Sequence, residues 1–340
     1  MPSAITLPDD QYAHAGAPTE WWWHIGTLKA GNRTFGFEIN AASFSYVLTQ
    51  FTEIMISDVA AQTHYRKNTV AALFNPFYAE SNTELPWYVQ IGGGVGANGA
   101  VQMHAPLGKI MPMSVVATFL DETTSTPCAL NLVLDQEEGA APLLVWGTGV
   151  HQNGPDNAPP LEKNNYYYSF TKLRANGTIQ IGDEVLQVHG LTWMDHEYGA
   201  FGAGTKWILQ DMQLDNGVHL SNFVTAAPPV EGQPMDSNVT VLWPDGRSVY
   251  LPSKLTPLAP TYTSPDGTVF CLTMKVEIPE LDAKLTVETL VAEQTFVDTL
   301  YEGVAVAHGT FGGRPVKGTA WNEQALSAPK PPVQGALAWR

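Results

Sequence analysis

The stretch GAPTEWWWHIGTL holds side chains suited to acid chemistry, because Glu20 precedes three consecutive tryptophans and His24. On a strand, side chains alternate between faces, so Glu20, Trp22 and His24 are expected on one face. Trp21 and Trp23 are then expected on the other. Burial among indole rings would raise the pKa of Glu20, by up to about 3–5, and make it a proton donor whose product cation the indoles stabilise. The alternative is an aromatic plug that closes a barrel, with Glu20 capping a turn.

A second stretch, VHGLTWMDHE, holds three consecutive ionisable residues, Asp195, His196 and Glu197. On a strand, Asp195 and Glu197 share a face with Trp193, whereas His196 points away. A tight turn starting at Tyr198 could still bring the three together. The pattern favours an acid/base cluster, and the alternative is a structural salt bridge at a solvated strand end.

This second stretch belongs to a weak internal repeat. Val188–Glu197 reads VHGLTWMDHE and Val316–Ala325 reads VKGTAWNEQA, and both fit Val-x-Gly-x-x-Trp. Two copies near the ends of two halves predict two related β domains in tandem, over 1–200 and 201–340. The shared glycine and tryptophan are interpreted as a turn and a core anchor. Because the second copy has Asn-Glu-Gln where the first has Asp-His-Glu, the three ionisable groups are interpreted as an addition to the first copy.

Further aromatic residues are candidates for substrate contacts. NNYYYSFTKL predicts a strand on which Tyr166 and Tyr168 share a face, and at least one phenol could orient a substrate or water. Tyr198 and Trp207 are added to these candidates. Neither a Gly-x-Ser-x-Gly elbow nor a second histidine at zincin spacing is present, and no metal or cofactor is expected. The two cysteines are far apart and are interpreted as buried free thiols.

The elements that must position these side chains are strands. RTFGFEINAASFSY, SVVATFLDE and TVETLVAEQTF alternate or run apolar in short lengths. Turn sequences recur at 97–99, 175–177, 215–217 and the Asp-Gly pairs at 245 and 266. We therefore predict an all-β protein of antiparallel strands closed into barrels or sandwiches, with an extended proline-rich tail over 327–335.

Composition narrows the classes of partner. The formal net charge of -16 repels phosphate backbones and anionic membrane surfaces, so neither nucleic acid nor membrane is an expected partner. No apolar run approaches the about 20 residues that span a bilayer. The first residues lack a basic segment followed by an apolar one, so a cytoplasmic location is expected.

Taken in order, TEWWWHIGTL, YYYSFTKL, VHGLTWMDHEYG, KWILQDMQLDNGVHL and YEGVAV resemble the AttH-like family over about 19–323. That family is similar to the carotenoid 1,2-hydratases (hydroxyneurosporene synthases) and the fungal kievitone hydratases. The resemblance implies two lipocalin-like β-barrels in tandem, with the site at or near their interface. Lipocalin-like Diels–Alderases have a similar architecture and use the space between domains. The chain departs from the family at GTKWILQ, where only Trp207 of a Gly-Trp-Asp-Trp-Phe string remains.

The resemblance implies addition of water to an isoprenoid double bond, with Trp193 and Asp195 matching one family element and Glu20 to Trp22 another. The leading hypothesis is a cofactor-free hydratase or dehydratase of terpenoid metabolism, acting on a hydrophobic, prenyl-bearing substrate. Asp195 or Glu20 would protonate the alkene, and His196 or Glu197 would position water. Alternatives are a cyclase or pericyclase that folds a polyene, and a carrier of apolar ligands without catalysis.

Overall fold

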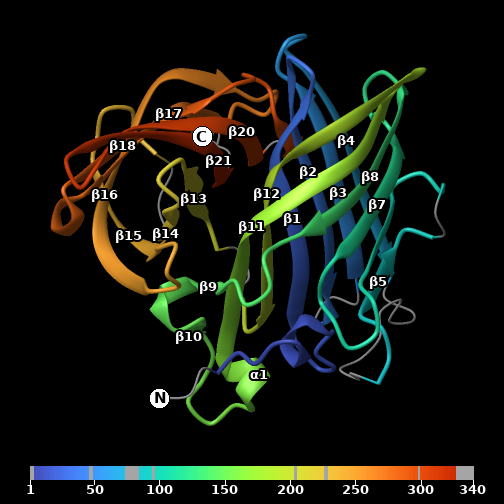
Figure 1. Ribbon diagram of the computed structural model, residues 1–340, viewed down its shortest axis with the longest axis horizontal. Helices are drawn as coiled ribbons and strands as arrows, with labels where there is room; N and C mark the ends of the chain where they lie inside the picture. The colour runs from blue at the N-terminus through green and yellow to red at the C-terminus, as the bar shows by residue number, and fades with distance from the viewer. Residues whose placement is uncertain are drawn as a thin grey trace, which may run out of the picture.

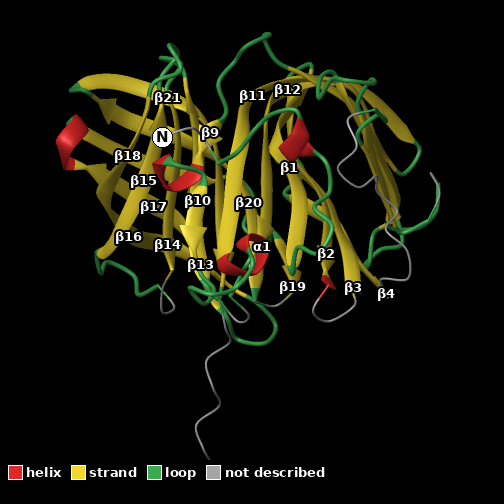
Figure 2. Ribbon diagram, turned by 90° about the horizontal axis from the view of Figure 1, so that it is seen from below, coloured by secondary structure: helices red, strands yellow, loops and turns green. Residues whose placement is uncertain are grey.

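The computed structural model describes residues 4–45, 49–72, 84–93, 96–202, 205–225, 229–297 and 299–326. These residues form two antiparallel sheets, of 12 and nine strands, and short helices only. Figure 1 shows the two sheets side by side, and Figure 2 shows how completely strands dominate. The all-β prediction is confirmed. The proline-rich tail at 327–335 lies outside the described residues.

The first sheet runs β4-β3-β2-β1-β12-β11-β8-β7-β6-β5, with β9 and β10 paired to β11, and curls into an open half-barrel. Its strands are β1 (Thr19–Ala30), β2 (Arg33–Phe44), β3 (Thr49–Asp58), β4 (Thr63–Ala72), β5 (Tyr88–Ile91), β6 (Ala100–His104), β7 (Met113–Leu120), β8 (Pro127–Asp135), β9 (Leu143–Leu144), β10 (Val150–Gln152), β11 (Asn164–Ile181) and β12 (Glu184–Gly199). β7 shows why such segments form strands: every second residue of MSVVATFL is buried, so one face packs on the core.

The second sheet runs β18-β17-β16-β15-β14-β13-β21-β20-β19, and a β18–β20 pairing closes it into a barrel. Its strands are β13 (Trp207–Leu214), β14 (His219–Thr225), β15 (Met235–Leu242), β16 (Ser248–Thr263), β17 (Val269–Ile278), β18 (Ala283–Thr289), β19 (Thr295–Val297), β20 (Leu300–Phe311) and β21 (Arg314–Ala325). The helices are η1 (Asp9–Gln11), η3 (Val145–Gly147), α1 (Pro160–Lys163) and η4 (Pro279–Leu281). Within the described residues, no helix has the length and apolar character that crossing a membrane requires.

Three apolar cores hold this arrangement together. One fills the first half-barrel and one fills the second barrel. The third joins the sheets and includes Trp193 of β12 and Trp321 of β21, both 2% exposed, as the repeat predicted for core anchors. The sheets approach so closely that a Cβ added at Gly36 would lie 2.4 Å from Cβ of Val304.

Two turn predictions are wrong. The glycines shared by the repeat, Gly190 and Gly318, lie inside β12 and β21, where a Cβ would meet the backbone of the neighbouring strand at 2.0 Å. Residues 175–177 lie inside β11, not between strands, and pair with both β8 and β12. The physical reason is close strand approach, because a Cβ at Gly177 would lie 2.0 Å from the carbonyl oxygen of Asn131. The segment TVETLVAEQTF also divides, into β18 and the short β19.

Candidate functional site between the two sheets

Strand β1 lies between β2 and β12, and its alternation separates the tryptophans as predicted. Trp22 packs in the core of the half-barrel, on the face that also carries Glu20. Trp21 and Trp23 project from the opposite face, toward the second sheet, and line a cavity. The sheet therefore separates two chemical environments within one stretch of sequence.

The cavity has a volume of about 610 Å³, within the range of small-molecule sites. Strands of both sheets contribute to it, so it lies between the two halves. Its aromatic lining comprises Trp21, Trp23, Trp146, Tyr167, Phe201, Trp207, Phe223 and Tyr250. Polar residues His151, Asn153, Asp236 and Asn238 lie at its exposed side, whereas the carboxyls of Asp195, Glu197 and Glu323 are buried.

Each of the three buried cavity carboxyls is held by hydrogen bonds. Asp195 Oδ1 accepts hydrogen bonds from Ser169 Oγ at 2.5 Å and Trp193 Nε1 at 2.7 Å. Asn165 Nδ2 donates to Glu197, and Trp207 Nε1 donates to Glu323. These contacts fix the carboxyl orientations but leave burial as the dominant electrostatic influence.

Burial raises the pKa of all three carboxyls, because removal from water disfavours the charged form. The pKa of Asp195 rises to about 6, although hydrogen bonds from Ser169 and Trp193 oppose the change. The pKa of Glu323 rises to about 8, with Trp207 opposing and Asp195 adding to the rise. The pKa of Glu197 lies well above its ordinary value for the same reason. At pH 7 the cavity therefore presents Glu197 and Glu323 as carboxylic acids, whereas Asp195, with a pKa of about 6, is mostly ionised.

Four more buried carboxyls interact electrostatically with those of the cavity, namely Glu38, Glu53, Asp211 and Glu302. Burial raises the pKa of each, and Glu53 reaches about 7. No lysine or arginine of the described ranges forms an ion pair with any of these four or with the three cavity carboxyls. Without such cations, this interface is electrostatically stable only if many of its carboxyls are protonated.

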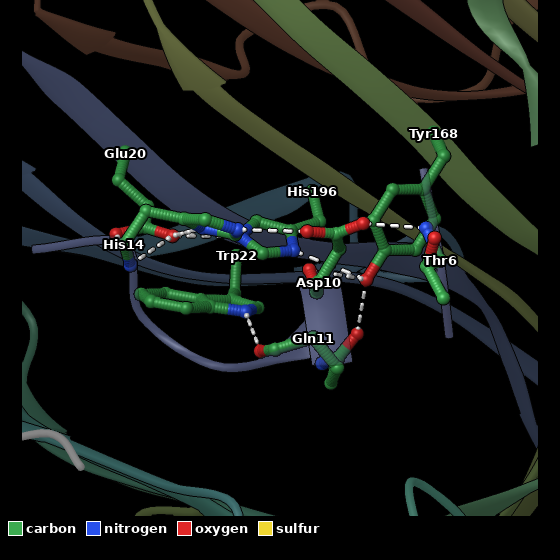
Figure 3. A network of polar contacts seen from close by, with 8 residues as sticks. All are labelled: Thr6, Asp10, Gln11, His14, Glu20, Trp22, Tyr168 and His196. Carbon is green, nitrogen blue, oxygen red and sulfur yellow. Dashed lines mark hydrogen bonds and ion pairs between the residues drawn. The ribbon is translucent and has the colours of Figure 1, made fainter. Parts of the chain in front are cut away.

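The opposite face of the first sheet carries a different network, drawn in Figure 3. Glu20 accepts hydrogen bonds from His14 Nδ1 at 2.8 Å and from the His14 backbone N–H at 2.9 Å. His196 Nε2 lies 3.1 Å from the same carboxyl, and His196 Nδ1 lies 3.1 Å from the Tyr168 hydroxyl. His14 Nε2 contacts Asp10 at 3.1 Å. The network ties the segment before β1 to the inside of the half-barrel.

The expected proton donor Glu20 is therefore a carboxylate. Burial alone would raise its pKa, but hydrogen bonds from His14 and His196 lower it below the ordinary value. Burial likewise opposes a charged His14, yet its hydrogen bonds to Asp10 and Glu20 raise its pKa to about 9. The prediction that tryptophans would raise the pKa of Glu20 is wrong, because the hydrogen bonds from the two histidines outweigh the effect of burial.

His14, Glu20 and His196 are also the described residues whose geometry could hold a metal ion. One ligand atom from each lies within 4.8 Å of the others. Two histidines and a carboxylate suit a divalent ion such as zinc. The same atoms hydrogen-bond one another here, so a metal would have to displace the protons between them.

The structure divides the predicted site residues between these two environments. Asp195, Glu197, Trp21, Trp23 and Trp207 line the cavity. The other predicted residues do not line the cavity, and most of them belong to the half-barrel core or to the network around Glu20. They are Glu20, Trp22, His24, Tyr166, Tyr168, His196 and Tyr198. Trp193 lies behind Asp195 and donates a hydrogen bond to it. No turn at Tyr198 reunites His196 with its neighbours, because β12 continues to Gly199.

Two important cavity residues were not predicted. Trp146 has φ 59°, a left-handed conformation rare outside glycine, and its ring meets Tyr167 edge-on at 5.8 Å. No sequence signal marked it. Glu323 had a signal, because it follows Trp321 by two residues as Asp195 follows Trp193. Both copies of the repeat therefore have a carboxyl two residues after the tryptophan, Asp195 in the first and Glu323 in the second. The interpretation of Asp195 as an addition to the first copy is wrong.

The fold and the cavity define a tandem lipocalin-like protein with a cavity between its two β halves. The family model described as AttH-like matches residues 101–325, so the chain belongs to the AttH-like family. The chain is similar to the NE1406 protein of Nitrosomonas europaea, which is assigned to AttH, with TM-score 0.72 and 18% identity over 95% of this chain and 97% of that one. It is also similar to kievitone hydratase from Nectria haematococca, with TM-score 0.73 and 16% identity over 96% and 94%. A comparison with curated protein sequences finds no match.

Proposed function

We propose that the protein is an acid/base enzyme of specialised metabolism that adds water to, or removes water from, the alkene of a hydrophobic, prenyl-bearing small molecule. The observation that carries this proposal is the cavity, in which buried carboxyls lie beside tryptophan rings. A carboxylic acid that keeps its proton near pH 7 can protonate an alkene. The tertiary cation that results is stabilised by indole faces.

The chemistry uses side chains of this chain alone. Asp195 and Glu197 come from β12, and Trp21 and Trp23 come from the neighbouring β1, so one strand pair presents carboxyls and rings together. The fold is similar to that of kievitone hydratase, and this likeness supports a hydratase. At 16–18% identity the solved structures share the fold with this chain, so the roles of the residues are argued from the cavity. Exposed polar residues at the cavity rim suit the oxygenated end of an amphipathic substrate.

Incubation with a panel of prenylated phenols, terpenoid alkenes and polyenes in water enriched in heavy oxygen tests the proposal. Mass spectrometry that finds one product with one added labelled water supports hydration. An unlabelled isomer would refute it in favour of cyclisation or pericyclic chemistry. Binding of panel members, detected by quenching of tryptophan fluorescence, with no product in either direction would identify a carrier instead.

A further inference from the structure

Glu323 is placed to meet the same bound molecule as Asp195, from the opposite half of the protein. Asp195 lies on β12 of the first sheet and Glu323 on β21 of the second, and both line the cavity. Their exposed fractions are 6% and 7%. Each follows the repeat's tryptophan by two residues, so strand alternation turns each toward the interface that the tryptophans also occupy.

The two carboxyls differ in the hydrogen bonds they accept. Asp195 Oδ1 accepts two, from Ser169 and Trp193, whereas Glu323 accepts one, from Trp207. Hydrogen-bond donors stabilise a carboxylate relative to the acid. With no lysine or arginine paired to either group in the described part of the chain, a negative charge on both at once is unfavourable. The charge therefore settles on Asp195 and the proton on Glu323.

We propose that Glu323 is the proton donor of the cavity and that Asp195 is its proton acceptor, so that each half of the protein supplies one carboxyl to the reaction. This assignment rests on the proposed function and deepens it. The order of the pKa values, about 8 for Glu323 and about 6 for Asp195, agrees with the hydrogen-bond pattern.

The step balances without a further reactant. The alkene π electrons take the Glu323 proton to form a C–H bond, which leaves a cation on the more substituted carbon. A lone pair of water forms the C–O bond, and Asp195 takes the proton that this water releases. Proton transfer from Asp195 to Glu323 through water restores the starting state, and dehydration runs the same steps backward.

Infrared spectroscopy locates the proton without any substrate. At pH 7 the carbonyl band of protonated carboxyls should weaken in Glu323→Gln relative to wild type, and the lost component should be the one that titrates near pH 8. Asp195→Asn should not weaken this band. Glu302→Gln is the matched control, because Glu302 is a buried, protonated carboxyl of the same interface that does not line the cavity. This variant should weaken the band but keep the component that titrates near pH 8. A band lost in Asp195→Asn and kept in Glu323→Gln would overturn the assignment.

Azide, a nucleophile that can replace water, distinguishes the proton donor from the proton acceptor. The substrate for this assay is the alkene that the labelled-water experiment identifies. Both Glu323→Gln and Asp195→Asn should lower the hydration rate by about 10²–10⁴-fold, while Glu302→Gln keeps it. Azide should restore turnover of Asp195→Asn as an azide adduct, because the cation still forms, and should not restore Glu323→Gln. Rescue of Glu323→Gln alone, or near-normal hydration by that variant when folded, would refute the proposal. A wild type that hydrates no alkene refutes the proposed function, and the infrared result still decides where the proton lies.

Discussion

Replacing His14 with glutamine should destabilise the fold strongly at pH 6 and only slightly at pH 10. His14 is 13% exposed at its side chain and lies between Asp10 and Glu20, with its ring stacked on Tyr198 at 3.6 Å. The charged imidazole is thus held by two carboxylates. The neighbouring His196 stays neutral because burial lowers its pKa, and burial raises the pKa of Tyr198, so neither supplies a competing charge.

The magnitude follows from the pKa of His14, which rises from 6.5 to about 9 on folding. That difference corresponds to about 3 kcal/mol of unfolding free energy. Because the folded state holds the proton more tightly, the stabilisation is complete below pH 6.5. It declines as the pH rises toward 9 and is absent above it, where both states are neutral.

Urea unfolding of wild type and His14→Gln at pH 6 and pH 10 measures this difference. We expect the loss in unfolding free energy to be about 3 kcal/mol larger at pH 6. His104→Gln is the control, because His104 is exposed and the same change there should cost little at either pH. The resonance that disappears from the histidine NMR spectrum of His14→Gln should titrate near 9 in wild type. An equal loss at both pH values, or titration of that resonance near 6.5, would refute the reasoning.

Three further outcomes are expected. Trp23→Phe should slow hydration by about 2- to 30-fold with little change in KM, because phenylalanine stabilises the cation by about 0.5–2 kcal/mol less than tryptophan does. Steady-state kinetics measure this effect, and an unchanged kcat would count against a cation. Glu20→Gln should lower the unfolding free energy by about 3–5 kcal/mol, because it removes one partner of a buried ion pair with His14. A bound ligand should still quench the fluorescence of the cavity tryptophans in the folded variant, and loss of this binding would place Glu20 in the site. Gly36→Ala should cost about 1–3 kcal/mol in urea unfolding, because its Cβ would collide with Val304; no loss would mean the halves pack less tightly.

The period of two residues in a strand predicted which side chains share a face of the sheet. The local sequence does not show which part of the protein that face packs against. The alternation of β1 placed Trp21 and Trp23 opposite Glu20, as the structure confirms for the two tryptophans that line the cavity. Whether a face lies inside a barrel or between two barrels depends on strand pairing and on packing of the second half. Asp195 pairs across the strands with Trp23, so it shares the cavity face, and the thickness of the sheet separates it from Glu20.

The pKa of Glu20 was predicted in the wrong direction because its decisive partner lies outside the strand. His14 precedes Glu20 by only six residues, but it reaches the carboxyl through a turn in which the Ala17 N–H bonds to the His14 carbonyl oxygen. A tryptophan-rich stretch indicates an apolar wall, and burial is indeed complete at Glu20. Burial sets how much the charged form of Glu20 loses in hydration, and its hydrogen-bond partners decide whether the pKa rises or falls.

Glu20 and Glu323 show how one residue type acquires two chemistries in the same protein. Both are carboxyls almost fully removed from water. Glu20 receives hydrogen bonds from two histidines and a backbone N–H, so its charge is stabilised and the group can anchor a structural network but cannot donate a proton. Glu323 receives one indole N–H and faces other carboxyls, so its proton is stabilised instead. An interface whose buried carboxyls have no lysine or arginine partner among the described residues therefore keeps the proton on Glu323, and a half-barrel interior supplied with histidines keeps the charge on Glu20.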